Sequence, residues 1–298
     1  MRKQLYGFAI LAWLGSVPSL ADETPLTMAS VLETSTPSDW RRLEQDRLLY
    51  LSLDSGDVVF ELAPQFAPAH IANLRKLVSQ KYFDGLAIIR SQDNYVVQWG
   101  DPDSGETGSR SFGEAARSLA PEFYRPSKGL DFTALDSRDA YADEVGFVDG
   151  FPAGRDGRGT WLAHCYGMLG VGRDNDPDSG SAAELYVVTG HAPRHLDRNV
   201  TLIGRVVAGV QHLSSLPRGT GPLGFYEDPA EYVHIESIRF GTGLDSNEQL
   251  QLEALRTDTE TFARFVEARR NRLEPWFVDP AGHVGLCNVP LPVRPVSP

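Results

Sequence analysis

The first hydrophobic pattern along the chain predicts a β-hairpin followed by a helix. Two short apolar runs, Leu48 to Leu53 and Val58 to Leu62, have the length of strands, and an Asp-Ser-Gly between them favours a tight turn. The spacing then changes to three and four residues, so that Ile71, Leu74 and Leu77 share one helical face. We therefore expect two antiparallel strands and then an amphipathic helix.

Further apolar runs predict more strands, with a long interruption among them. A strand pair is expected over residues 86–100, three strands over 167–207, a short helix over 209–216 and a last strand over 232–241. From Asp101 to Trp161 the chain is rich in Gly, Pro, Ser, Asp and Arg, which favours a loop with one short helix near Glu114 to Ala120. A loop of that length is unusual unless it serves a function.

Residues 244–298 have a different character from the strand-rich part. The stretch 247–277 is charged, lacks Pro and Gly before Pro275, and repeats apolar residues at intervals of three and four, which predicts a helical extension. The tail after it is rich in proline and is expected to be an extended strap. Residues 22–46 are polar and are expected to form a linker.

The N-terminus has the layout of a secretory signal peptide. Arg2 and Lys3 precede an apolar stretch from Leu5 to Val17, and the small residues Ser19 and Ala21 follow. The apolar stretch is too short to span a bilayer, so cleavage after Ala21 is expected. The sequence therefore predicts an exported protein, with the bacterial periplasm as its compartment.

Charge and cysteine content limit the partners. A formal charge of −12 and a pI of about 5.0 disfavour nucleic acid, and no later segment is long and apolar enough to be a membrane helix. Cys165 and Cys287 can pair in an oxidising compartment, or they can be a buried thiol and a tail thiol. The sequence leaves both alternatives open, and it does not predict an oligomeric state.

One strand-like run, IIRSQDNYVVQWGDPD (residues 88–103), contains an isolated Arg90 and, eight residues later, Gln98. A guanidinium without a partner is costly to bury, so an arginine in such a run has a carboxylate beside it or a cleft in front of it. The alternative is a surface strand on which the arginine extends to solvent.

Four segments in the same order resemble the cyclophilin-type peptidyl-prolyl isomerases, especially the shorter bacterial periplasmic kind. They are ELAPQFAPAHIANLRKLVSQKYFDG, the run IIRSQDNYVVQWGDPD, GMLGVGRDNDPDSGSAAELYVVTG and HLDRNVTLIGRVVAGVQHL. The resemblance covers about Leu48 to Gly241. It implies a mainly β fold, a closed eight-stranded antiparallel barrel capped by two helices, here spanning residues 47–243 with an insertion at about 102–160. The C-terminal helical extension, 244–298 with its tail, is expected to pack on the barrel outside the cleft.

The resemblance also implies a site. Arg90 takes the position of the catalytic arginine and Gln98 that of the glutamine in the signature. The implied substrate-binding residues are Tyr95, Val96, Gly172, Arg173, Glu184, Tyr186, His195 and Leu196. The sequence departs from the family at Glu184, where Gln is usual, at His195, where Trp or Phe is usual, and at Val200, where His is usual. Trp99-Gly100 replaces a Gly-Gly pair.

Prolyl isomerisation requires few chemical groups. Rotation about a peptide bond meets a barrier of roughly 18–20 kcal/mol and takes about 10–100 s for Xaa-Pro without a catalyst. An apolar pocket for the ring and a donor near the imide suffice, and arginine suits the donor because it stays charged and offers several N–H groups. The resemblance implies no cofactor and no metal.

Structural interpretations compete with these roles. Tyr95, Tyr186 and Leu196 are core residues if the pocket is filled. His191 and His195 are four apart, but the proline between them disfavours a helical metal pair. The acidic run 174–178 lacks the closing Glu of a calcium loop, which favours a solvated turn.

These observations leave three hypotheses for the function of the protein. The first is a prolyl isomerase acting on unfolded or partly folded exported proteins that contain proline. The second is a peptide-binding or chaperone module with weak catalysis, motivated by Glu184, Val200 and the long insertion. The third, an unrelated all-β hydrolase, has only scattered His, Asp and Ser residues behind it.

Overall fold

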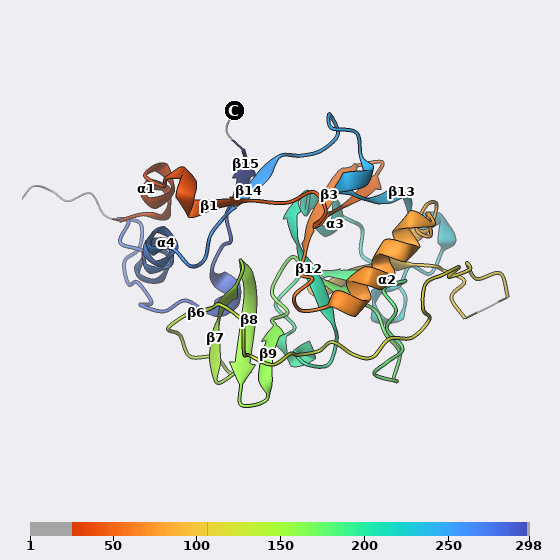
Figure 1. Cartoon of the computed structure of the whole chain (residues 1–298), viewed down its shortest axis with the longest axis horizontal. Helices are drawn as coiled ribbons and strands as arrows, with labels where there is room; N and C mark the ends of the chain where they lie inside the picture. The colour runs from red at the N-terminus through yellow and green to blue at the C-terminus, as the bar shows by residue number, and fades with distance from the viewer. Residues whose placement is uncertain (1–25, 106, 297–298) are drawn as a thin grey trace, which may run out of the picture.

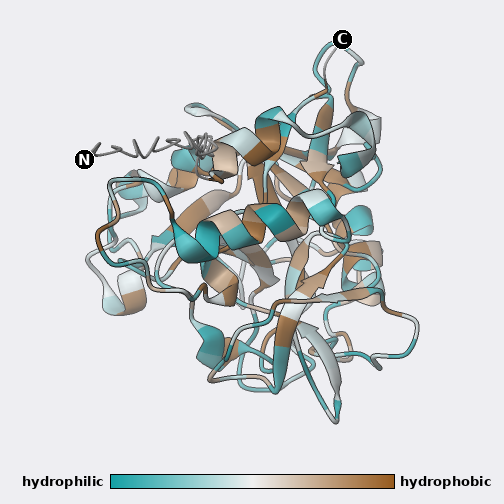
Figure 2. Ribbon diagram, turned by 90° about the vertical axis from the view of Figure 1, so that its left-hand side faces the viewer, coloured by the Kyte–Doolittle hydropathy of each residue, from teal (hydrophilic) through white to brown (hydrophobic). Residues whose placement is uncertain are grey.

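The computed structural model describes residues 26–105 and 107–296, so the expected signal peptide, 1–21, lies outside the described residues. Figure 1 shows a barrel flanked by helix α2 and, beside it, a second group of elements built from both ends of the described chain and from strands β6 to β9. Hydrophobic residues gather in the interior strands, and hydrophilic residues occupy the peripheral loops (Figure 2). No described helix has the length and apolar character needed to cross a bilayer.

The predicted mainly β barrel is confirmed. Its antiparallel strands follow the closed order β10-β11-β5-β4-β13-β2-β3-β12. Their bounds are β2 Leu48–Leu53, β3 Gly56–Leu62, β4 Ala87–Ser91, β5 Val96–Gly100, β10 Met168–Val171, β11 Leu185–Val188, β12 Leu202–Ala208 and β13 Val233–Phe240. The first hairpin forms where it is expected, with Leu53 opposite Gly56 at its turn.

Strand β2 shows why a continuous apolar run forms here. Leu49, Leu51 and Leu53 belong to the core inside the barrel, whereas Leu48 and Tyr50 belong to a separate cluster with Leu252 and Ala254. Successive side chains on a strand point to opposite faces, so both faces of β2 are covered. The outer cover comes from residues near the C-terminus, far away in sequence.

Two helices cap the barrel, as the resemblance implies. Helix α2, Pro68–Ser79, begins with a proline in its first turn and buries Ile71, Leu74 and Leu77 in the barrel core. Helix α3, Gln211–Ser214, is a single turn that buries Leu213. Single 3₁₀ turns occur at η1 Pro37–Asp39, η2 Arg194–Leu196, η3 Pro222–Gly224, η4 Pro229–Glu231, η5 Gly241–Gly243 and η6 Leu286–Asn288.

The expectation of a loop over 102–160 is wrong for its second half. Strands β6 Phe132–Ala134, β7 Glu144–Val148, β8 Phe151–Asp156 and β9 Gly159–Leu162 form an antiparallel sheet, and residues 114–120 are not helical.

Glycines explain why these strands lack an alternating hydrophobic pattern in the sequence. A Cβ on Gly146 would lie 2.8 Å from the ring of Phe132, and one on Gly154 would lie 2.9 Å from the ring of Trp161. Glycine makes room for the rings and interrupts the apolar alternation.

The expectations for the two terminal segments also need correction. The segment 22–46 is no simple linker, because it contains α1 Met28–Glu33 and β1 Trp40–Arg42. The stretch 247–277 is not one helix but β14 Leu252–Leu255 followed by α4 Glu260–Asn271.

In β14, Leu252 and Ala254 are both buried, a period of two rather than 3.6. The side chain of Thr259 caps α4 by accepting a hydrogen bond from the backbone N–H of Phe262 at 3.2 Å. This cap marks the start of the helix at Glu260.

The terminal segments form a three-stranded sheet in the order β1-β14-β15, where β15 is Val293–Pro295. Helix α4 packs against α1 and against β7, where the rings of Phe262 and Phe147 meet edge to face at 5.1 Å. The expected packing of this helix on the barrel is therefore wrong. Its apolar stripe instead completes a second core, which extends to barrel residues such as Val188.

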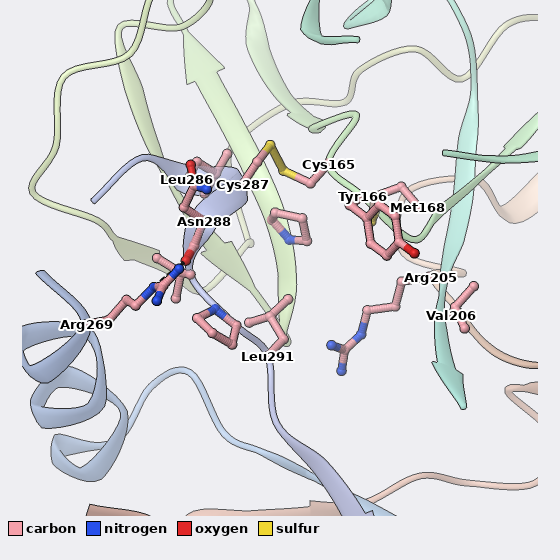
Figure 3. A pocket seen from close by; sticks show the side chains of 13 residues that line it. Cys165, Tyr166, Met168, Arg205, Val206, Arg269, Leu286, Cys287, Asn288 and Leu291 are labelled. Atoms are coloured by element: carbon pink, nitrogen blue, oxygen red, sulfur yellow. Dashed lines mark hydrogen bonds between the residues drawn. A yellow bond between two sulfur atoms is a disulfide. The ribbon is translucent and has the colours of Figure 1, made fainter. Parts of the chain in front are cut away.

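A buried ion-pair cluster joins this part of the molecule to the barrel, and a disulfide links two segments of the second core. Glu61 of β3 is buried and lies 2.6 Å from Arg41 Nη1 and 3.1 Å from Arg205 Nη2. Cys165 and Cys287 form a disulfide, which settles the alternative that the sequence leaves open. Figure 3 shows this disulfide at the edge of a cavity of about 340 Å³, where the side chain of Arg269 extends toward Asn288.

Candidate functional site

A cleft of about 640 Å³ opens on the barrel over strands β4, β5 and β11. Nine of the ten sequence-predicted site residues line it, namely Arg90, Tyr95, Val96, Gln98, Gly172, Arg173, Glu184, Tyr186 and Leu196. Val200 lines it as well. The tenth residue, His195, does not.

Strand register brings the central residues of the cleft together. Gln98 on β5 lies opposite Arg90 on β4 and opposite Tyr186 on β11. The pairing of β4 with β5 shifts by one residue between Ile88 and Arg90, which is a β-bulge. A bulge turns the next side chain away from regular alternation. Arg90 thus lies on the same face as Gln98 and reaches the cleft.

The guanidinium of Arg90 is held by three acceptors. Nη1 donates to Gln98 Oε1 at 2.9 Å, Nε donates to the carbonyl oxygen of Leu223 at 2.8 Å, and Nη2 donates to Gln92 Oε1. The rings of Tyr95 and Phe225 lie 5.7 and 5.3 Å from its central carbon. Burial lowers the pKa of Arg90, but a guanidinium stays protonated at neutral pH.

Glu184 explains the orientation of Gln98. Gln98 Nε2 donates to Glu184 Oε2 at 2.9 Å, so the amide oxygen of Gln98 is directed to Arg90. A carboxylate only accepts, and this accepting role is the one that the arrangement uses. Burial, together with the charges of Asp174 and Asp101, raises the pKa of Glu184.

The Trp99-Gly100 pair fits the same arrangement. A Cβ on Gly100 would lie 2.6 Å from the Cγ of Glu184, so the glycine leaves space for that side chain. Trp99 is fully buried and its ring lies 6.0 Å from that of Phe60 inside the barrel. The tryptophan therefore contributes to the core rather than to the cleft.

Tyr186 lies at the end of a buried polar chain that sequence reasoning missed. Its hydroxyl lies 2.9 Å from His164 Nε2, and His164 Nδ1 lies 2.9 Å from Asp197 Oδ1. Burial raises the pKa of Tyr186 and lowers the pKa of His164, so both are neutral at pH 7. Because a carboxylate only accepts, His164 Nδ1–H donates to Asp197 and Nε2 accepts from the tyrosine.

The polar chain continues into the insertion. Asp197 Oδ2 accepts from Trp161 Nε1 at 3.2 Å and from Arg194 Nε at 2.6 Å, and Arg194 in turn pairs with Asp139. Two sequence signals point to it. A tyrosine hydroxyl in a buried strand needs a partner, and His164 is the one polar side chain in the run WLAHC that has a matching acceptor nitrogen.

His195 lies outside the cleft lining, whereas Arg173 lies within it, as the resemblance implies. His195 is exposed in the turn η2, and its ring stacks on that of Tyr95 at 6.3 Å, outside the cleft lining. Arg173 lines the cleft, but its Nε donates to the carbonyl oxygen of Asn199 at 2.8 Å. Within the described residues, His, Cys, Asp and Glu side chains form no group of three or more placed to hold a metal ion.

The fold and the cleft define a mainly β barrel protein with a groove of mixed polar and apolar lining beside a fixed arginine. The chain belongs to the family "Cyclophilin type peptidyl-prolyl cis-trans isomerase/CLD", which matches residues 48–240. Membership makes it a peptidyl-prolyl cis-trans isomerase, and proline-containing peptides are the substrates that this implies.

Relatives of this chain have the same assignment. It is 25% identical to a probable peptidyl-prolyl cis-trans isomerase of Brucella suis over 177 residues. This matched region covers 59% of this chain and 74% of the relative. It is 24% identical over 278 residues to the isomerase CYP23 of Arabidopsis thaliana, which covers 92% of this chain and 97% of that protein. The crystal structure of cyclophilin AquaCyp293 from Hirschia baltica matches with a TM-score of 0.68 at 24% identity, over 91% of this chain and 98% of that one. The likeness therefore extends well beyond the barrel.

Proposed function

We propose that Arg90 is the group that stabilises the twisted prolyl imide in the cleft. The observation that carries this proposal is the state of its guanidinium. Of its five N–H donors, three are held by Leu223, Gln92 and Gln98, which leaves two without an acceptor among the described residues. A substrate that enters the cleft meets a charged donor that is already oriented.

The chemistry follows from this preorganisation. A hydrogen bond from Arg90 to the substrate imide draws the nitrogen lone pair away from the amide resonance, which lowers the barrier to rotation. Tyr95, Val96 and Tyr186 supply apolar surface for the proline ring. Gln98 and Glu184 fix the guanidinium before the substrate binds, so no reorganisation is needed in the transition state.

The substrates are Xaa-Pro bonds in unfolded or partly folded proteins of the exported compartment. The signal-peptide pattern of residues 1–21 supports this proposal, and so does the disulfide, because disulfides persist in oxidising compartments. The cleft is open to solvent, which is compatible with an extended chain passing through it.

The test is the rate of cis-to-trans conversion of a short Xaa-Pro peptide with the mature protein and with Arg90→Ala. We expect kcat to fall by about 10²–10³, as for other preorganised donors. Arg264→Ala, an exposed arginine on α4, is the matched control and is expected to retain full activity. Full activity of the folded Arg90→Ala protein would exclude Arg90 as the donor.

One observation favours a second use of the same cleft, the binding of peptides without turnover. Glu184 is a half-buried carboxylate near the charges of Asp174 and Asp101, and this negative charge weakens the effect of the arginine charge on the bound imide. Peptide affinity that survives Arg90→Ala, with little isomerisation by the unaltered protein, would identify this binding function.

A further inference from the structure

Residues 217–227, here called the Leu223 loop, line one end of the cleft. The loop follows the edge of β4: Gly219 N–H donates to the carbonyl oxygen of Ser91 at 3.0 Å, and Tyr226 N–H donates to that of Ile89 at 3.0 Å. The buried Tyr226 closes the loop, because its hydroxyl donates to the carbonyl oxygen of Pro217 at 2.7 Å. The loop is therefore fixed to the strand that carries Arg90.

Leu223 has an unusual conformation at the tip of this loop. Its φ is +58°, in the left-handed region that residues with a Cβ rarely adopt. Its side chain is 66% exposed, yet it lines the cleft with Phe225. A strained backbone that displays a large apolar side chain to solvent is an arrangement found at ligand-binding positions.

The residue after Leu223 packs closely against the barrel. A Cβ on the next residue, Gly224, would lie 2.5 Å from the Cα of Gln92, so the loop backbone lies directly against the turn between β4 and β5. The carbonyl oxygen of Leu223 accepts from Arg90 Nε. The same residue therefore orients the arginine through its backbone and presents leucine beside it.

The two ends of the cleft differ in chemistry. Leu223 and Phe225 lie beside Arg90, whereas the lining around Glu184 is polar and charged and continues into a neighbouring pocket. That polar part contains Asp101, Ser104, Arg173 and Asp174. A peptide whose proline occupies the pocket thus has an apolar wall on one flank and a polar wall on the other.

We propose that Leu223 and Phe225 form an apolar subsite that selects Xaa-Pro segments with a large aliphatic or aromatic residue next to the proline. This inference rests on the proposed function of the cleft. Burying the exposed leucine against such a residue removes apolar surface from water on both partners, which favours binding. Segments of this composition are buried in folded proteins and exposed in unfolded ones.

The test uses four peptides of one framework, with leucine or serine immediately before or immediately after the proline. The readout is the ratio of kcat/KM for the leucine peptide to that for the serine peptide, measured separately for each flank. We expect the unaltered protein to prefer leucine on one flank, and Leu223→Asn to reduce that ratio by about tenfold. Asparagine tolerates the left-handed conformation and keeps the backbone carbonyl, and the ratio cancels any loss common to both peptides.

Further variants separate the possible results. Leu223→Gly, which relieves the backbone strain, is expected to lose the preference as well, and Leu223→Met is expected to retain it. Leu273→Asn, an exposed leucine outside the cleft lining, is the control. A preference on neither flank, or a ratio that stays the same in Leu223→Asn and Leu223→Gly, would overturn the inference. Failure of the unaltered protein to accelerate any of the four peptides would instead count against the proposed function.

Discussion

The hydroxyl of Tyr186 lies 2.9 Å from Nε2 of His164, and neither side chain has an appreciable exposed surface. The tyrosine ring lines the cleft, whereas the histidine follows strand β9 of the insertion. A Cβ on Gly170 would lie 2.3 Å from Cζ of that ring, so the ring is also closely covered from β10. The insertion therefore determines the position of one wall of the cleft.

Tyr186→Phe tests this relationship. Phenylalanine keeps the ring but leaves the buried Nε2 of His164 without a donor. We expect a loss of about 1–3 kcal/mol in the free energy of unfolding, measured with denaturant. Tyr141→Phe, at an exposed tyrosine, is expected to change it by less than about 0.5 kcal/mol. Equal stability of Tyr186→Phe and the unaltered protein would mean that the hydrogen bond contributes nothing.

His164 is expected to make the fold sensitive to acid. Burial lowers its pKa in the folded protein, so the unfolded chain binds the proton more tightly. The contribution of neutral His164 to the free energy of unfolding is therefore fully present above the unfolded pKa of about 6.5. It is lost as the pH falls below that value. The slope for one such group reaches about 1.4 kcal/mol per pH unit. His164→Asn, which has no titrating ring, should show a smaller loss between pH 7.5 and 5.5, and parallel curves for the two proteins would argue against a neutral buried histidine.

Glu184→Gln is expected to stabilise the protein at neutral pH. Burial raises the pKa of this carboxyl, so the folded protein binds its proton more tightly than the unfolded chain does. The unaltered protein is then most stable below the unfolded pKa of about 4.3 and loses stability as pH rises through the folded value. A glutamine still offers an oxygen to Gln98 Nε2.

The measurement is the difference in unfolding free energy between Glu184→Gln and the unaltered protein at pH 4 and pH 7. We expect the variant to gain stability relative to the unaltered protein when the pH is raised from 4 to 7. Glu236→Gln, an exposed glutamate on β13, should show no such shift. A variant that becomes relatively less stable with rising pH would show that the carboxylate is well compensated by its neighbours.

The disulfide is expected to contribute strongly to stability. It joins residues 122 apart, and closing a loop of about 100 residues removes roughly 4.7 kcal/mol of unfolded-chain entropy in the simplest treatment. We expect the free energy of unfolding of the double variant Cys165→Ser, Cys287→Ser to be about 3–5 kcal/mol lower than that of the unaltered protein. Reduction of the unaltered protein should have the same effect, and the reductant should not affect the double variant.

The barrel could be predicted from sequence because its signals are local. In helix α2 and in the hairpin of β2 and β3, the hydrophobic pattern that identifies the element lies within a few consecutive residues. The family resemblance then placed nine residues in one cleft. His195 lies outside the lining, because a family resemblance does not determine which way a side chain in a 3₁₀ turn points.

The remaining structure depends on contacts between distant segments. Strand β1 has three residues, and its partner β14 follows about two hundred residues later, so neither has a periodic pattern that identifies it alone. The strands of the insertion carry glycines under aromatic rings, as at Gly154 and Trp161. His164 acquires its role only when Tyr186 and Asp197 are brought beside it by the fold.

The sheet β1-β14-β15 also determines the order in which the described chain can be completed during synthesis. Every strand of the barrel leaves the ribosome before β14 does, because β13 ends at Phe240 and β14 begins at Leu252. Among the described residues, strand β1 pairs only with β14, and Cys165 cannot form its disulfide before Cys287 has been made. The barrel can therefore close, on the ribosome or on the far side of a membrane, while the segment made before it remains without its partner, and the earliest described residues become fixed among the last.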